Sequence, residues 1–407
     1  MSDILFFGCG QIPLNSKSPV DGAGFRTWQI FNGLKSQGHT VYLANYSYDG
    51  TIFYQDRSIL HEHSLHCNSE TSQDELILTI DPDVIVYYYW PIININDVSC
   101  VKAIPVCIDF AGPVLIEKHF QDGGLKIETI LNKIHKINIG DFFTCSGKRQ
   151  YYYFSALLLM SGITEIIDDS IMEILPLSAD PKMNQRLNRT KTSDTIIKCI
   201  HCGYFHPWQN PINGLHRFAE YVKKSKNIEL DIYGIPSSMG EDDKRIQEKI
   251  GFNSKIHYLG CQNYSRVIDG IRNADFALDV MSKSLERELS MNIRTLQYLC
   301  NGIPIIYNDY AEISPLIERY DAGWCINPDK LEEIDSILDD IVNNPNQLDQ
   351  KGINAQKLVC DNFNWEKTIE PLSKFCFNPK KRERNVLYIK EFINSYPKSL
   401  INLLYTT

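Results

Sequence analysis

Short apolar runs alternate along the whole chain with stretches in which apolar residues recur at helical spacing. In the first half, helical spacing occurs at 25–37, 125–137 and 148–160. The shorter apolar runs there are residues 4–7, 40–44, 76–80, 84–89, 104–108, 141–146 and 172–177. Strands that alternate with helices favour a parallel sheet covered on both faces.

The same pattern starts again after an interruption. Between Ser178 and Thr195 the sequence is polar and contains a proline, which is typical of an interdomain linker. Beyond it, expected strands at 196–202, 228–233, 256–259, 275–280, 303–307 and 323–326 alternate with expected helices, among them 213–224, 242–250 and 264–272. We therefore expect two doubly wound α/β domains, residues 1–180 and 195–362. Two such domains in tandem place a ligand cleft between the carboxyl ends of their sheets.

Length and charge set outer bounds on function. A chain of 407 residues suits two domains rather than one core. The net charge of −9, from 41 basic and 50 acidic residues, argues against a nucleic-acid binder, which must neutralise phosphates. The beginning of the chain is too short and acidic for a signal peptide, and no apolar run approaches the roughly 20 residues that cross a bilayer. We therefore expect a cytoplasmic protein.

The cysteines favour a structural interpretation. Several of the 12 lie in apolar strand-like runs, where a reduced cysteine behaves as a small hydrophobe. Cys199 and Cys202 form a C-x-x-C inside an expected strand, and no second pair follows at zinc-finger spacing. Neither a disulfide framework nor a zinc site is expected.

In the first half, the candidate ligand-binding residues follow two expected strands. Gly22 and Gly24 let backbone N–H groups approach a ligand at the start of a helix, and the alternative is a plain turn. A cation is disfavoured at a helix N-terminus, so Arg26 is expected to serve an anion or a sugar. Asp109 ends an expected strand and is a candidate for orienting an acceptor hydroxyl, with a turn-stabilising role as the alternative. Glu117 and His119 are weaker candidates further along.

In the second half, one segment combines glycine, aromatic and amide side chains. Gly203 ends the first expected strand, and Gly234 closes the next one. The intervening loop offers aromatic and polar groups suited to a sugar, a base or a diphosphate, namely Tyr204, His206, Trp208, Gln209 and Asn210. Prolines at 207 and 211 stiffen it, and the alternative is a loop in which the tryptophan only anchors packing.

A charged cluster lies at the entry to a later helix. Glu286 and Glu288 precede Arg294, which falls on the same helical face as Gln297. Arginine grips a diphosphate through its planar fork, and the alternative is a solvated surface arginine.

Together these segments resemble glycosyltransferase family 4, in particular its bacterial subgroup linked to cell-surface polysaccharides. The resemblance rests on D-G-A-G-F-R-T-W at 21–28, D-F-F-T-C-S at 141–146, G-Y-F-H-P-W-Q-N-P at 203–211 and E-L-S-M-N-I-R-T-L-Q-Y-L-C-N-G-I-P at 288–304. It implies the GT-B fold, with two Rossmann-like domains facing a central cleft. It also implies that residues 363–407 form helices that cross back to the first domain.

The same resemblance implies transfer of a sugar from a nucleotide-diphosphate-sugar donor to a glycan or lipid-linked glycan, with retention of configuration and without metal or cofactor. A donor phosphate oxygen would then accept the hydroxyl proton. Asp109, Arg294 and Glu288 are the expected catalytic residues. The residues expected to bind the donor are Gly203, Tyr204, His206, Trp208, Gln209, Asn210, Gly234, Arg294, Thr295 and Gln297. Those expected to bind the acceptor are Gly22, Gly24, Arg26, Asp109 and His119. Peripheral association with the inner face of a membrane stays open.

Departures from the family keep two alternatives open. Many members carry two glutamates eight positions apart, whereas Leu289 and Gln297 stand at those positions here, and Glu288 is the expected substitute. His206 and Gln209 replace a basic pair, which leaves Arg294 to supply the charge. The alternatives are a catalytically silent GT-B protein that binds a glycan or a partner, and a nucleotide-sugar epimerase.

Overall fold

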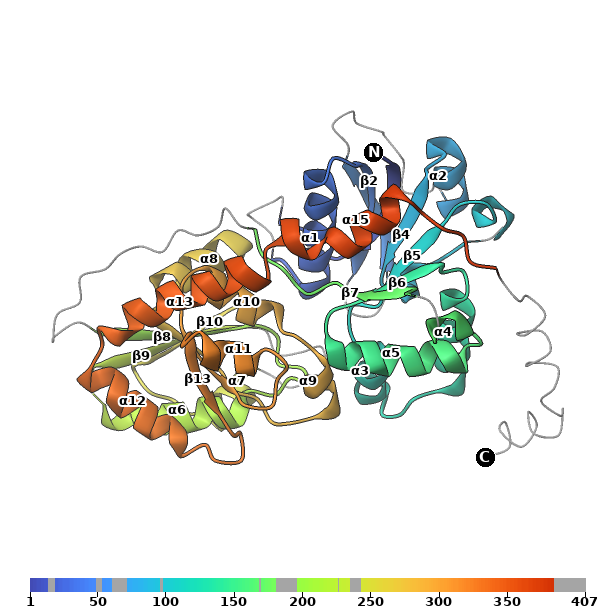
Figure 1. Ribbon diagram of the computed structural model, residues 1–407. Coiled ribbons are helices and arrows are strands. Elements are labelled where there is room, and N and C mark those ends of the chain that lie inside the picture. The colour runs from blue at the N-terminus through green and yellow to red at the C-terminus, as the bar shows by residue number, and fades with distance from the viewer. Residues whose placement is uncertain are drawn as a thin grey trace, which may run out of the picture.

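The computed structural model contains two mainly parallel sheets, each covered by helices (Figure 1). It describes residues 1–13, 19–48, 53–60, 72–95, 98–167, 170–180, 196–225, 227–234 and 243–383. The boundary expected between 180 and 195 falls mainly outside these residues, and the domain limits stay a prediction. No helix within the described ranges has the length and apolarity needed to cross a membrane.

The first sheet has seven strands in the order β3-β2-β1-β4-β5-β6-β7. They are β1 (Asp3–Cys9), β2 (Thr40–Tyr48), β3 (Phe53–Leu60), β4 (Val84–Tyr88), β5 (Val106–Asp109), β6 (Phe142–Cys145) and β7 (Met172–Ile174). All neighbours are parallel except β2 and β3, which are antiparallel. The helices of this half are α1 (Gly22–Ser36), α2 (Gln73–Ile80), α3 (Val114–Asp122), α4 (Ile127–Ile137) and α5 (Lys148–Met160).

The apolar run at 76–80 is part of helix α2 rather than a strand. Ser72 and Glu75 form a capping box, in which each side chain accepts a hydrogen bond from the other residue's backbone N–H. Leu76 and Ile77 are buried. The cap therefore decides between helix and strand for a run whose hydrophobicity fits both.

The second sheet is parallel throughout, with the order β10-β9-β8-β11-β12-β13. Its strands are β8 (Ile197–Cys202), β9 (Ile228–Tyr233), β10 (Ile256–Gly260), β11 (Phe276–Asp279), β12 (Ile305–Asn308) and β13 (Gly323–Ile326). Its helices are α6 (Ile212–Lys224), α7 (Asp243–Ile250), α8 (Tyr264–Asn273), α9 (Leu285–Leu289), α10 (Ile293–Cys300), α11 (Ser314–Arg319), α12 (Glu333–Asn343) and α13 (Gln347–Asn362). The expected alternation of strands and helices is confirmed in both halves.

The last described helices cross back to the first half, as expected (Figure 1). Helices α14 (Trp365–Thr368) and α15 (Glu370–Phe377) lie against the first sheet's core, where Ile369 and Leu372 are buried. The ring of Phe375 stacks on Phe142 at a centroid distance of 4.5 Å. A further helix expected at 385–404 lies outside the described residues.

Candidate functional site

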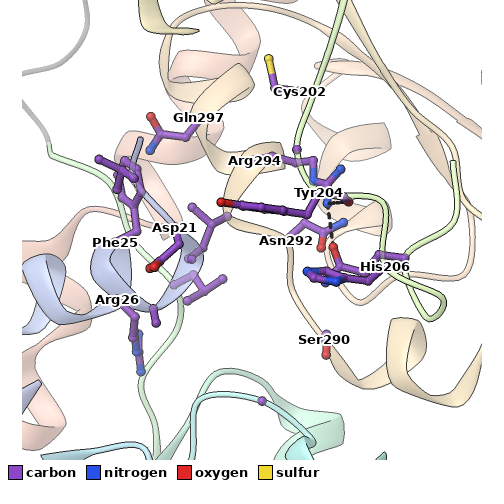
Figure 2. A pocket seen from close by; sticks show the side chains of 18 of the residues that line it. Asp21, Phe25, Arg26, Cys202, Tyr204, His206, Ser290, Asn292, Arg294 and Gln297 are labelled. Carbon is purple, nitrogen blue, oxygen red and sulfur yellow. Dashed lines mark hydrogen bonds between the residues drawn. The ribbon is translucent and has the colours of Figure 1, made fainter. Parts of the chain in front are cut away.

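A cavity of about 600 Å³ lies between the two halves, at the carboxyl ends of both sheets (Figure 2). Cys9 and Tyr88 line it from the ends of β1 and β4, and Cys202 and Tyr233 from the ends of β8 and β9. Strand ends of a doubly wound sheet are where such folds bind ligands. The central cleft expected from the sequence is therefore present.

Arg294, in the first turn of α10, lies directly over the end of β8. Gly203 has φ +135°, and a Cβ atom there would lie 2.5 Å from the Arg294 Cζ atom. Nη2 of Arg294 donates to Gln209 Oε1 at 2.6 Å, whereas its buried Nη1 has no hydrogen-bond partner. The nearest carboxylate oxygen is Asp279 Oδ1, at 3.9 Å from Nη1. The guanidinium is thus held in place with one donor nitrogen unused.

Two aromatic rings of the same loop stack against each other beside Arg294. His206 and Trp208 have a centroid separation of 4.6 Å and an interplanar angle of 1°, and Tyr204 lies next to His206 at 5.6 Å. Burial and the positive charge of Arg294 lower the pKa of His206 to about 4. The imidazole is therefore neutral near pH 7, and the stack offers an uncharged platform at the cleft.

The carboxylate that reaches the cleft from α9 is Glu286. It is 1% exposed and receives two hydrogen bonds from Arg287, at 2.5 and 2.6 Å, and one from Ser290 at 2.7 Å. Arg287 in turn donates to the Asn292 side chain. All four residues line the cavity.

Three expected donor-site residues do not line the cleft, which corrects those expectations. Glu288 points away and pairs with Lys283 at 3.1 Å. Thr295 is fully buried and donates to Asp279 at 3.0 Å. Asn210 is exposed, and its side chain accepts a hydrogen bond from the backbone of Ile212. By contrast, the cleft brings together Gly203, Tyr204, His206, Trp208, Gln209, Gly234, Arg294 and Gln297.

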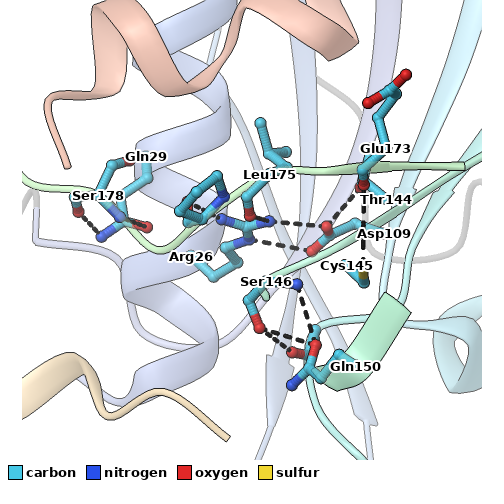
Figure 3. A network of polar contacts seen from close by, with 12 residues as sticks. Arg26, Gln29, Asp109, Thr144, Cys145, Ser146, Gln150, Glu173, Leu175 and Ser178 are labelled. Atoms are coloured by element: carbon cyan, nitrogen blue, oxygen red, sulfur yellow. Dashed lines mark hydrogen bonds and ion pairs between the residues drawn. The ribbon is translucent and has the colours of Figure 1, made fainter. Parts of the chain in front are cut away.

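Arg26 lines the cleft, but its guanidinium is occupied by a buried ion pair with Asp109 (Figure 3). Arg26 donates to the two carboxylate oxygens at 3.1 and 2.8 Å, and Thr144 donates to the same carboxylate at 2.6 Å. The remaining guanidinium donors reach the carbonyl oxygens of Leu175 and Pro176 at 2.7 and 2.8 Å. Asp109 is 0% exposed, so the expectation that it points into the cleft is wrong.

Of the two glycines at the start of α1, Gly24 is required by the packing of the loop and Gly22 lines the cleft. Asp21 caps the helix and accepts from the Gly24 N–H at 2.6 Å, so that amide is already bonded. A Cβ atom at Gly24 would lie 1.9 Å from the backbone oxygen of Gln11, whereas Gly22 lines the cleft. His119 is exposed and outside the cleft lining, which corrects its expected role.

Some cleft residues, such as Ser290 and Asn292, were not identified as candidates from the sequence, whereas Glu286 belongs to the charged cluster noted there. Glu286 and Arg287 are adjacent in the sequence and form an ion pair, and Arg287 also donates to the Asn292 side chain. The acidic and basic residues side by side in the sequence are the local signal for this pair. Glu117, a weaker candidate from the sequence, lines the cleft from the first turn of α3. Within the described residues, no group of three His, Cys, Asp or Glu side chains is placed to hold a metal ion.

Comparisons with known proteins bear on this arrangement. No protein-family model matches the chain. Over 206 residues, 50% of the chain, it is 23% identical to an uncharacterized glycosyltransferase of Methanocaldococcus jannaschii. That alignment covers 49% of the archaeal protein, so the chain spans about half the length of this curated relative.

Solved structures resemble the chain over nearly its whole length. Sucrose-phosphate synthase of Thermosynechococcus elongatus superposes with a TM-score of 0.62 at 11% identity, covering 97% of this chain and 100% of that one. HepE of Anabaena, solved in complex with UDP and glucose, gives a TM-score of 0.59 at 11% identity, covering 93% and 100%. The chain has the GT-B fold. The GT-B architecture expected from the sequence is thereby confirmed, whereas the family 4 subgroup stays a prediction.

Proposed function

We propose that this protein is a glycosyltransferase that moves a sugar from a nucleotide-diphosphate-sugar donor to a hydroxyl group of an acceptor. The observation that carries the proposal is the guanidinium of Arg294, which lines the cleft over Gly203 and whose buried Nη1 makes no hydrogen bond, with Asp279 Oδ1 3.9 Å away. A buried donor without a partner costs free energy, and a ligand oxygen at this point would recover it.

A diphosphate fits this position chemically. When the sugar leaves, negative charge develops on the diphosphate, and a preorganised guanidinium in a cleft stabilises that charge strongly. Gly203 and Gly234 contribute space rather than hydrogen bonds, because their N–H groups already donate to Tyr233 and Gly260. Arg294 is therefore the proposed diphosphate ligand, and Gly203 leaves the room that its guanidinium occupies.

The remaining donor contacts follow from the neighbouring residues. The neutral His206–Trp208 stack offers a flat surface for a base or a sugar ring. Gln297 has a buried Oε1 without a hydrogen-bond partner, which suits a ligand hydroxyl or amide. The structurally similar HepE was solved in complex with UDP and glucose, so UDP-glucose is the first donor to test.

The finer features of the reaction rest on the family resemblance. We propose retention of configuration without a metal ion, with a donor phosphate oxygen taking the acceptor proton. We further propose that the acceptor, a glycan or a lipid-linked glycan of a surface polysaccharide, binds from the first half. The residues of the first half that line the cleft include Gly22, Tyr89 and Glu117.

A screen of nucleotide sugars tests this function. Thermal shift with UDP-, GDP-, TDP- and CMP-sugars is expected to identify one that raises the melting temperature. Chromatography then measures release of the nucleoside diphosphate, and NMR assigns the anomeric configuration of the product. Binding without release of the nucleotide, even with candidate acceptors present, would instead support the catalytically silent protein.

A further inference from the structure

The described residues place three carboxylates in the lining of the cleft, and two of them are occupied. Asp21 accepts hydrogen bonds from the backbone of Gly24 and Gln11. Glu286 is bound by Arg287. The third, Glu117, is half-buried and has no hydrogen bond or ion pair to any described residue. It is therefore free to accept a hydrogen bond from a bound ligand.

We infer that Glu117 is the first-half carboxylate that binds the reacting hydroxyl of the acceptor, opposite Glu286. Glu117 lies in α3, and this helix contacts α9, which carries Glu286, across the cleft. The inference rests on the proposed transferase function. It assigns to Glu117 the acceptor role that the sequence suggested for Asp109, whose carboxylate is fully occupied by Arg26 and Thr144.

The surroundings of Glu117 favour a proton-sensitive carboxylate. Burial, and then the nearby negative charge of Glu286, raise the pKa of Glu117 to about 7. The charged and titratable groups that act on it or respond to it are Glu286 and Arg287 on α9, Lys133 on α4, Lys118 on α3 itself and Tyr153 on α5. The basic groups among them oppose the rise.

Lys133 does not neutralise Glu117 by a direct ion pair. Its fully buried ammonium group has no hydrogen-bond partner and lies over the rings of Phe154, Phe110 and Trp90, at 5.0, 5.6 and 5.7 Å from their centroids. Burial lowers the pKa of Lys133 to about 7. The Glu117 carboxylate is therefore left without a fixed partner.

Two carboxylates in one cleft, one paired and one unpaired, suit different tasks in a reaction. Ionised Glu117 accepts a hydrogen bond from the acceptor hydroxyl and orients its oxygen towards the anomeric carbon. The new bond joins this oxygen to that carbon, while the bond from the carbon to the diphosphate breaks. The electron pair leaves with the diphosphate. The hydroxyl proton, which is shared between Glu117 and a diphosphate oxygen before the reaction, passes to that oxygen as its negative charge develops.

Titration of Glu117 tests its environment independently of activity. In ¹³C-carboxyl NMR, the signal removed by Glu117→Gln is expected to titrate near pH 7. Glu286→Gln should lower that midpoint, because it removes a negative neighbour. Asp122→Asn, an exposed change on the same helix, should leave the midpoint unchanged. A midpoint that Glu286→Gln leaves unchanged would contradict the placement of Glu117 opposite Glu286.

Donor hydrolysis, with water as the acceptor, tests the role in transfer. At saturating UDP-glucose, or the nucleotide sugar that stabilises the protein most, Glu117→Gln should lower the hydrolysis rate about 10-fold or more, since a charged hydrogen-bond acceptor is lost. The wild-type rate should rise with pH through pH 7, as Glu117 ionises. In Glu117→Gln this rise should be absent, and the Kd for UDP should equal that of the wild type. Asp122→Asn should match the wild type throughout.

The two possible failures are distinguishable. A wild-type protein that turns over no donor contradicts the proposed function itself. A wild type that hydrolyses the donor, with Glu117→Gln equally fast at every pH, contradicts only the role of Glu117.

Discussion

Replacing Arg294 by alanine removes the positive charge that we place at the donor diphosphate. The free protein loses the bond to Gln209 and the charge that faces Asp279. The complex also loses one or two charge-assisted hydrogen bonds to the ligand, worth about 1.5–3 kcal/mol in total. Because about 1.4 kcal/mol corresponds to a factor of ten, the Kd for UDP should rise about 10- to 150-fold.

Loss of stability accompanies this change and needs a separate control. Asp279 is 0% exposed, and without Arg294 its Oδ1 atom, which has no hydrogen bond, faces no cation. We expect a stability loss of about 1–3 kcal/mol. The double variant Arg294→Ala, Asp279→Asn should recover part of the stability because the uncompensated charge is gone. It should recover none of the affinity for UDP.

Isothermal titration calorimetry with UDP measures the affinity, and urea unfolding measures the stability. Arg266→Ala is the matched control, because Arg266 is an exposed arginine of the same half and does not line the cleft. Gly203→Ala is a second perturbation of the same point, since its Cβ would collide with the Arg294 guanidinium. An Arg294→Ala protein that is folded and binds UDP as tightly as the wild type would refute the proposed role.

Three further predictions concern other parts of the molecule. Asp109→Ala should lower the free energy of unfolding by about 3–5 kcal/mol, since it leaves Arg26 buried without its carboxylate; a variant of normal stability with impaired turnover would restore the catalytic interpretation. Ending the chain at Asn362 should give an unstable protein, because Ile369 and Leu372 leave the first core uncovered; a soluble, active truncation would contradict this. Trp208→Ala should weaken nucleotide-sugar binding by about 1 kcal/mol through loss of the stack, measured by calorimetry, and unchanged binding would assign Trp208 to packing alone.

Periodicity predicted the fold because buried parallel strands leave a strong local signal. The runs at β4 and β12 are apolar apart from Asn308 and are wholly buried, so both faces of these strands are covered. Loop glycine and aromatic residues after β8 were also predictable, because a strand end in a parallel sheet opens into the ligand cleft. The antiparallel strand β3 was not predicted, and neither was the helical state of residues 76–80.

The wrong predictions of site residues come from contacts between residues that are distant in sequence or from the orientation of a helix, and no local sequence pattern indicates either. Arg26 and Asp109 are 83 positions apart, and only the folded sheet shows that each is the other's partner. The choice between Glu286 and Glu288 depends on the orientation of the short helix α9, which directs the first towards the cleft and the second towards Lys283. Glu117 gains its properties from burial and from Glu286, which is distant in sequence.

Turnover of a nucleotide sugar tests the central claim most directly. The measurement is release of the nucleoside diphosphate from the best-stabilising donor, by wild type and by Arg294→Ala at equal concentrations of folded protein. The account predicts release by the wild type and a strong loss in the variant. It would be contradicted if no nucleotide sugar bound the cleft, or if both proteins released the nucleotide at the same rate.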